Sequence, residues 1–316
     1  MPEEAAAAAV EPAGSSSFFD GSGGWKLHVE SWSGADRPDG SVAAAVVFLH
    51  GVNESSQTLT ARRLAARFVA LGCSFHALEQ HGHGLSLQRD TGGGAMREQP
   101  AGLIDSGERL IEHAAEACAH VASALAPPGT RIVLLGHSMG ASVAALAAPR
   151  VAAAADHQLR VVALLAPTFA LRPKIKPAAA VLAALSAVAW VAPSLAIGPP
   201  EHPASYCPPD VEPPGRNYDG RMRGRTAAFF LALEDAPAPA LPAGVPAAVF
   251  VGAKDPIVDP RTGQLLVDAA EAAGGAGAAR PEVIIFPQAG HQLIAVDKRW
   301  KTHVDAVATW VMAQLA

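Results

Sequence analysis

The chain has 316 residues and three cysteines, and its 24 Lys and Arg residues against 29 Asp and Glu give a formal net charge of −5. This length is enough to bury a large core. The scattered cations form no basic stripe, so no nucleic-acid partner is expected. The three widely spaced cysteines exclude a disulfide framework and a cysteine zinc site.

The chain opens with an alanine-rich stretch, and residues 1–17 are expected to form a disordered tail. Two glutamates precede the alanines, whereas a secretory signal carries a basic segment followed by a leucine-type core. We therefore expect no secretory signal and a cytoplasmic protein. Residues 18–316 are predicted to form a single domain.

The first strong strand pattern covers residues 42–49, and the loop after it begins with His50 and Gly51. In enzymes with a nucleophilic serine, a backbone N–H in a loop after an early strand supplies one donor of the oxyanion hole. Val52 is the expected donor, because Gly51 permits a sharp turn just before it. An ordinary strand-ending turn is the alternative for this loop.

Residues 80–86 read Gln-His-Gly-His-Gly-Leu-Ser. His81 and His83 have the spacing of a chelating His-x-His pair, so a metal site is one interpretation. No accompanying set of carboxylates is found near them in the sequence. A structural turn is therefore the preferred interpretation, and no metal ion is expected.

Residues 131–135 read Arg-Ile-Val-Leu-Leu, and this largely apolar run leads directly into Gly-His-Ser-Met-Gly at residues 136–140, after which a small-residue helical pattern begins. A buried strand followed by G-x-S-x-G and a helix is typical of a nucleophile elbow, whose tight turn strains the backbone of Ser138 and exposes its hydroxyl. The flanking glycines let strand and helix pass closely. Met139 N–H is then the second expected oxyanion donor. A serine in an ordinary strand–helix turn is the alternative.

The longest apolar stretch, residues 178–197, lies between predicted strands at residues 160–166 and 247–252. Its length approaches that of a transmembrane helix, but Pro193 interrupts it and alanine is only weakly hydrophobic. A helix of the core is a second interpretation. The third, which we prefer, is a cap inserted into the domain.

Two late strands are each followed by a residue that a nucleophilic serine requires, and the order Ser, Asp, His is that of the elbow-containing fold. Asp255 follows residues 247–252, and His291 follows residues 282–286. Parallel strands end at one edge of a sheet, so both loops are expected beside Ser138. Asp259 is the second candidate acid. His303 is the second candidate base, but it falls in a helical pattern and is expected at the surface.

Together these motifs resemble the monoacylglycerol lipase and lysophospholipase branch of the α/β-hydrolases. The resemblance covers nearly all of the chain from about residue 24 and rests on residues 50–51, 80–86, 136–140, 252–255 and 290–291. It implies an α/β-hydrolase fold, with an eight-stranded, mostly parallel sheet, helices on both faces and a helical cap at about residues 167–243. It implies no cofactor. It also implies roles for five residues, with Ser138 as nucleophile, Asp255 as acid, His291 as base, and Val52 and Met139 as oxyanion donors.

The same resemblance suggests substrate contacts. Glu54 matches a glutamate that helps bind the glycerol end of the substrate, although a solvated loop carboxylate is the alternative. Thr58 and Ile294 depart from the family pattern, because an arginine and a second histidine are common there. In the cap, the residues expected to line an acyl tunnel or to touch a lipid surface are Leu182, Leu185, Val188 and residues 190–195.

The sequence therefore predicts a serine hydrolase that cleaves carboxylic esters through an acyl-enzyme, with monoacylglycerol- or lysophospholipid-like lipids as substrates. Its expected partner is a small-molecule ester, and a peripheral membrane contact through the cap is a further expectation. The same triad also serves acyltransferases, peptidases and cofactor-free haloperoxidases, which stay as alternatives. A catalytically silent receptor or scaffold of this fold is the alternative from a different class.

Overall fold

The computed structural model describes residues 14–33, 42–92, 94–154, 158–175, 179–198, 220–274 and 280–316. Most of the predicted tail, residues 1–13, lies outside the described residues. The predicted end of that tail is wrong, because Ser15 already pairs with Ser31 in an antiparallel strand pair. Three consecutive serines are compatible with this edge position, where side chains face solvent.

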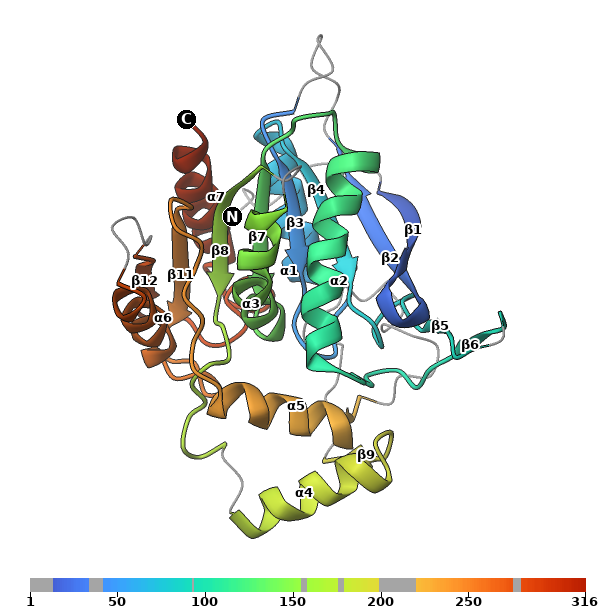
Figure 1. Ribbon diagram of the computed structural model, residues 1–316. Helices are drawn as coiled ribbons and strands as arrows, with labels where there is room; N and C mark the ends of the chain where they lie inside the picture. The colour runs from blue at the N-terminus through green and yellow to red at the C-terminus, as the bar shows by residue number, and fades with distance from the viewer. Residues whose placement is uncertain are drawn as a thin grey trace, which may run out of the picture.

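A single large sheet forms the centre of the molecule (Figure 1). Its strands are β1 (Ser15–Gly21), β2 (Trp25–Trp32), β3 (Ala45–Leu49), β4 (Ser74–Glu79), β5 (Gln88–Asp90), β6 (Met96–Glu98), β7 (Ile132–His137), β8 (Leu159–Leu165), β11 (Ala247–Gly252) and β12 (Glu282–Phe286). The order is β12-β11-β8-β7-β3-β4-β2-β5-β6, with β1 also paired to β2. The six strands from β12 to β4 are parallel, and the remaining pairs are antiparallel.

The predicted fold class, a mostly parallel sheet with helices on both faces, is confirmed. The sheet has ten strands where eight were expected, because the three-residue strands β5 and β6 extend one edge. Both strands consist mainly of polar residues, so the sequence lacks the alternation of apolar and polar residues from which a strand is predicted.

Seven α-helices accompany the sheet among the described residues. They are α1 (Leu59–Ala70), α2 (Gly107–His120), α3 (Met139–Ala153), α4 (Ala179–Val191), α5 (Gly224–Asp235), α6 (Arg261–Ala272) and α7 (Trp300–Leu315). A 3₁₀ helix (Ser22–Gly24), a π-helical turn (Val121–Leu125) and a ribbon of β9 (Ala196–Ile197) with β10 (Met222–Arg223) complete the described elements. Thr58 and Ser106 cap α1 and α2 by accepting backbone N–H bonds at the first turn.

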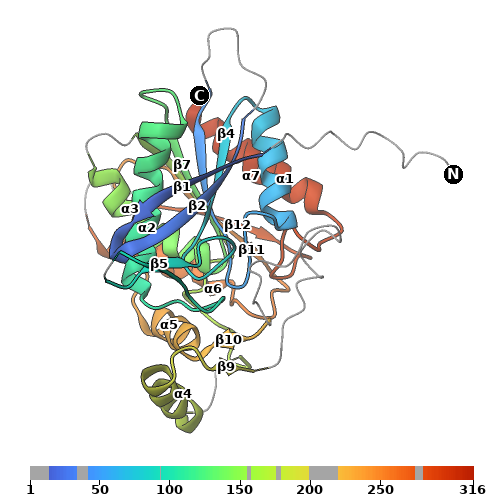
Figure 2. The same ribbon diagram turned by 90° about the vertical axis from the view of Figure 1, so that its right-hand side faces the viewer.

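Alternate residues of each central strand face opposite layers, as the period of two in a strand requires. In β3, Val47 packs on the side of α2 and α3, whereas Phe48 packs on the side of α1 and α7. Figure 1 shows α2 and α3 in front of the sheet, and Figure 2 shows α1 and α7 on the other side. The central helix α3 is rich in alanine, and ten of its residues are buried. Its small side chains let it lie close to the sheet, which fixes the turn at its beginning.

The described segments between β8 and β11 lie beyond the carboxyl ends of the parallel strands, where α4 and α5 cross the lower end of the molecule (Figure 1). They fall within residues 167–243, the range predicted for a cap, although residues 176–178 and 199–219 lie outside the described residues. The long apolar stretch forms α4 and β9. Across the described ranges, no helix has the length and apolarity needed to cross a membrane.

Candidate active site

Ser138 occupies the turn between β7 and α3 with φ of 53° and ψ of −120°, a conformation that residues other than glycine rarely adopt. The strained backbone expected at an elbow is therefore present. A Cβ atom at Gly136 would collide with the backbone of Gly140, and one at Gly140 would collide with the backbone of β3. The two glycines thus permit the close crossing of strand and helix that produces the turn.

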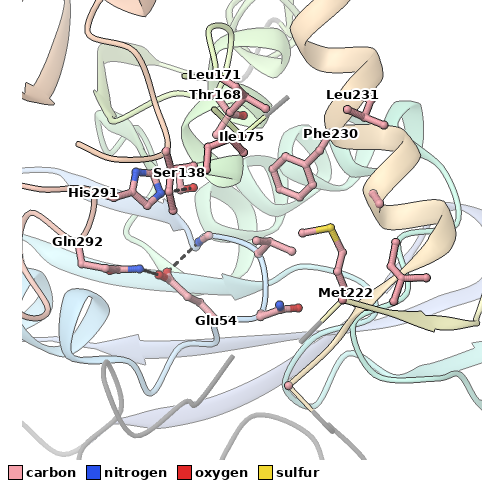
Figure 3. A pocket seen from close by; sticks show the side chains of 18 of the residues that line it. Glu54, Ser138, Thr168, Leu171, Ile175, Met222, Phe230, Leu231, His291 and Gln292 are labelled. Carbon is pink, nitrogen blue, oxygen red and sulfur yellow. Dashed lines mark hydrogen bonds between the residues drawn. The ribbon is translucent and has the colours of Figure 1, made fainter. Parts of the chain in front are cut away.

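Three side chains from separate loops meet at the carboxyl edge of the sheet, and Figure 3 shows two of them, Ser138 and His291, facing each other. The Oγ atom of Ser138 lies 2.9 Å from Nε2 of His291, and Nδ1 of His291 lies 2.7 Å from Oδ2 of Asp255. All three residues are buried. The structure therefore brings the predicted nucleophile, base and acid into one chain of hydrogen bonds.

Asp255 is held in place by the loop that follows β11. Its Oδ1 atom accepts the backbone N–H groups of Ile257 and Val258, each at 2.8 Å, which leaves Oδ2 for His291. The second candidate acid, Asp259, instead accepts the backbone N–H of Arg261 and pairs with its guanidinium. Burial would raise the pKa of Asp259, but these contacts lower it overall.

His303 does not approach Ser138, and its expected position at the surface is wrong. The residue is buried in α7, where its Nδ1 lies 2.8 Å from the carbonyl oxygen of Leu293 and its ring lies against Phe286. A polar residue in a helical pattern favours the solvent side, but here a loop carbonyl satisfies the imidazole and permits its burial.

The two predicted oxyanion donors flank the nucleophile. Met139 is the first residue of α3, so its N–H has no partner within the helix. Val52 lines the cavity beside Ser138, and among the hydrogen bonds of residues 42–92 none engages the Val52 N–H. Neither N–H is therefore committed to a backbone hydrogen bond among the described residues.

Glu54 is only 2% exposed, so the alternative of a solvated loop carboxylate is wrong. It accepts the Gly51 N–H at 2.9 Å and Nε2 of Gln292 at 3.0 Å, and it lies 3.3 Å from Nδ1 of His137. Burial would raise the pKa of Glu54, but the charge and hydrogen bond of His137 and the bonds from Gln292 and Gly51 lower it to about 2. Glu54 is therefore a charged carboxylate bound mainly by the protein itself.

A cavity of about 560 Å³ opens from Ser138 and His291, a size typical of small-molecule sites. Glu54 and Gln292 line one end beside the serine, and Phe230 and Leu231 of α5 line the other (Figure 3). The remaining apolar lining comes from Val52, Leu171, Ile175, Leu185, Ile197, Met222, Ala227 and Ile257. Ser138 thus lies near the polar end of a cavity whose remaining lining is mostly apolar.

Of the cap residues predicted to line this cavity, Leu185 does so. Val188 does not, because it faces α5, where its Cγ1 lies 2.9 Å from the position of a Cβ on Gly224. The side chain of Leu182 lies outside the described residues. Sequence reasoning missed Met222 and Phe230, although the apolar run of α5 directly after an arginine-rich segment was a usable signal.

His81 and His83 belong to a turn in which Gly82 donates its N–H to the carbonyl of Ser86. The two imidazoles diverge, because His81 contacts His113 while His83 lies against His50. Within the described part of the chain, no three His, Cys, Asp or Glu side chains come together as a metal site would require.

Comparisons with known proteins relate this geometry to other molecules. Residues 40–298 match the family described as serine aminopeptidase, S33. None of the curated protein sequences that were compared matched the chain. A soluble variant of monoglyceride lipase from Saccharomyces cerevisiae, solved with a substrate analog, has a TM-score of 0.69 at 15% identity, over 97% of each chain.

Two further solved structures are similar. Monoacylglycerol lipase of Paleococcus ferrophilus has a TM-score of 0.65 at 16% identity, over 91% of this chain and 99% of that one. Est1E of Butyrivibrio proteoclasticus, with ferulic acid bound, has a TM-score of 0.60 at 14% identity, over 95% of this chain and 99% of that one. At such identities these likenesses show a common fold.

Proposed function

The chain belongs to the serine aminopeptidase S33 family of α/β-hydrolases, and from that premise we propose that it is a serine hydrolase that cleaves carboxylic esters through an acyl-enzyme. The observation that carries this proposal is the hydrogen-bonded series of Ser138, His291 and Asp255, of which the first two line a mostly apolar cavity. A serine is a weak nucleophile until an adjacent base removes its proton, and this arrangement supplies the base.

In the proposed reaction, Nε2 of His291 takes the proton of Ser138 as Oγ attacks the ester carbonyl. The N–H groups of Val52 and Met139 bind the resulting oxyanion, and Asp255 stabilises the imidazolium. The carbon–oxygen bond to the alcohol then breaks, and the alcohol leaves with the proton from His291. Water, deprotonated by the same histidine, then attacks the acyl carbon. The bond to Oγ of Ser138 breaks, the acid leaves, and His291 returns the proton to Oγ.

The shape of the cavity supports an ester with an acyl chain and a small polar alcohol. Its apolar end, between α4 and α5, suits a hydrocarbon chain, and the polar end beside Glu54 and Gln292 suits a hydroxylated alcohol. Monoacylglycerol- and lysophospholipid-like lipids combine these two parts, and they are the substrates we propose.

A peptidase is the second candidate, because the family description names an aminopeptidase. Binding a free amino terminus requires a carboxylate in the cavity, and Glu54 is the carboxylate among the described lining residues. Since Glu54 is already bound by three protein donors, the site suits an amino terminus less well than an ester. Cleavage of amino-acid p-nitroanilides at a rate above that of esters would favour the peptidase.

We also propose that the outer face of α4 rests on a lipid surface. The helix contains no charged residue, and Trp190 and Val191 are 82% and 73% exposed. A helix at the surface of a globular domain normally presents polar residues to water. Ile175 is 45% exposed and also lines the cavity, so the apolar lining reaches the surface.

The test of the proposed function is turnover of p-nitrophenyl butyrate, glycerol monoesters and lysophospholipids by the purified chain and by Ser138→Ala. We expect ester hydrolysis that falls by about 10⁶ in the variant, whose circular dichroism spectrum stays unchanged. Equal activity of the two proteins would refute the nucleophilic role of Ser138. A competing alcohol added to the reaction separates transfer of the acyl group from hydrolysis.

A further inference from the structure

Glu54 lies where three loops of the site meet. Its Oε2 atom accepts the Gly51 N–H at 2.9 Å, and its Oε1 atom accepts Nε2 of Gln292 at 3.0 Å. The carboxylate also lies 3.3 Å from Nδ1 of His137. One buried side chain thus holds the loop after β3, the loop after β12 and the end of β7.

Each of the three partners is a chain neighbour of a group in the proposed reaction. Gly51 precedes Val52, Gln292 follows His291, and His137 precedes Ser138. A shift of any of the three loops would therefore move an oxyanion donor, the base or the nucleophile. Misplacement by about 1 Å can cost an enzyme about 100-fold in rate.

His137 extends this set of contacts to the base. While Nδ1 faces Glu54, Nε2 lies 3.4 Å from the carbonyl oxygen of His291. An imidazole can donate at both nitrogens only as the imidazolium. Burial would lower the pKa of His137, but the charge and hydrogen bond of Glu54 raise it overall. These contacts favour the protonated form of His137 opposite the buried carboxylate of Glu54.

We propose that Glu54, paired with His137, is a positioning residue that holds the oxyanion loop and the loop of the catalytic histidine against the nucleophile elbow. This inference rests on the proposed ester hydrolase function. It differs from the role that the sequence resemblance suggests for Glu54, which is a direct contact with the glycerol end of a substrate. A carboxylate offers about four acceptor sites, and three protein donors already surround this one.

The two roles predict different dependence on the leaving alcohol. A contact with glycerol matters only for substrates that contain glycerol, whereas misplaced catalytic groups slow every ester. Butyryl glycerol and p-nitrophenyl butyrate share one acyl group and differ in the alcohol. Measuring kcat and KM for both esters therefore separates the two roles.

The variants are Glu54→Met, which removes both acceptors at nearly constant volume, and Glu54→Gln, which keeps one accepting oxygen. The matched control is Glu79→Met. Glu79 is also a buried carboxylate with a histidine partner, His28 at 2.9 Å, and with backbone donors, but it contacts no neighbour of the triad. Thermal unfolding is measured for every protein, together with labelling of the serine by a fluorophosphonate.

We expect Glu54→Met to lower kcat by about 100-fold for both esters, with KM changed by less than about threefold. Glu54→Gln should recover part of this loss, because its oxygen can still accept the Gly51 N–H. Glu79→Met should lower the melting temperature as much as Glu54→Met and keep kcat within about threefold. If Glu54→Met does not fold, Glu54→Gln alone should lose about tenfold in kcat for both esters.

A loss confined to KM for butyryl glycerol would overturn the inference in favour of a substrate contact. Equal losses of kcat in the Glu54 and Glu79 variants would overturn it in favour of a general effect on stability. If the unsubstituted protein neither reacts with the fluorophosphonate nor hydrolyses either ester, the proposed function itself fails, and the inference with it.

Discussion

Replacing Asp255 by asparagine tests the orienting role that we propose for its carboxylate. Asparagine has one accepting oxygen in place of two. If that oxygen keeps the bonds from the Ile257 and Val258 N–H groups, the amide NH₂ faces Nδ1 of His291. The imidazole must then accept at Nδ1 and carry its proton on Nε2, where it cannot take the proton of Ser138.

The size of the effect follows from the cost of reversing the asparagine amide. A reversed amide would direct its NH₂ group at the two backbone N–H groups and leave both without an acceptor. Each unsatisfied group costs roughly 1–3 kcal/mol, so reversal costs roughly 2–6 kcal/mol. This range corresponds to about 30-fold to about 10⁴-fold in rate, and its upper end matches the loss from the same change in a Ser-His-Asp protease triad.

The assay is kcat/KM for p-nitrophenyl butyrate, with thermal unfolding measured to establish that Asp255→Asn is folded. Asp259→Asn is the matched control, because Asp259 binds Arg261 and should leave kcat/KM within about twofold. An Asp255→Asn enzyme within threefold of the unsubstituted protein would refute the reasoning.

Three further predictions concern strain, acid stability and lipid contact. Ser138→Gly should increase the free energy of unfolding by about 1–3 kcal/mol, because glycine adopts this backbone conformation without strain. Denaturant titration measures the change, and a decrease in the free energy of unfolding would contradict the prediction. Burial lowers the pKa of His76 to about 4 and of His83 and His113 to about 3, so the unfolded chain binds more protons below about pH 6.5. The free energy of unfolding should therefore fall as the pH drops from 6.5 towards 4, and constant stability over that range would be evidence against buried neutral imidazoles. Trp190→Ala should lower the affinity for anionic phospholipid vesicles, measured by co-sedimentation, by about tenfold and leave p-nitrophenyl butyrate turnover unchanged. Equal co-sedimentation of the two proteins would refute the lipid contact.

The convergence of Ser138, Asp255 and His291 could be predicted because each follows a recognisable buried strand. Parallel strands place their following loops at one edge, so chain order and strand ends were sufficient to choose Asp255 over Asp259. Fold class followed from the same strands, whose apolar runs are continuous because helices cover both faces.

Other features depend on packing that one sequence does not reveal. Leu185 and Val188 lie one helical turn apart in a helix that contains no charged residue, and no polar face indicates which of them meets the cavity. Glu54 resembles any loop carboxylate until the three donors around it are known. His303 was misjudged for the same reason, because its partner is a backbone carbonyl ten residues away.

The measurement that tests the central claim most directly is identification of the residue that a fluorophosphonate modifies. The chain is incubated with a fluorophosphonate, its intact mass is determined, and the digested peptides are sequenced by tandem mass spectrometry. We predict one adduct per chain, located on Ser138, and its absence from Asp255→Asn over the same short incubation. An adduct on another residue, or none on the unsubstituted protein, would contradict the account.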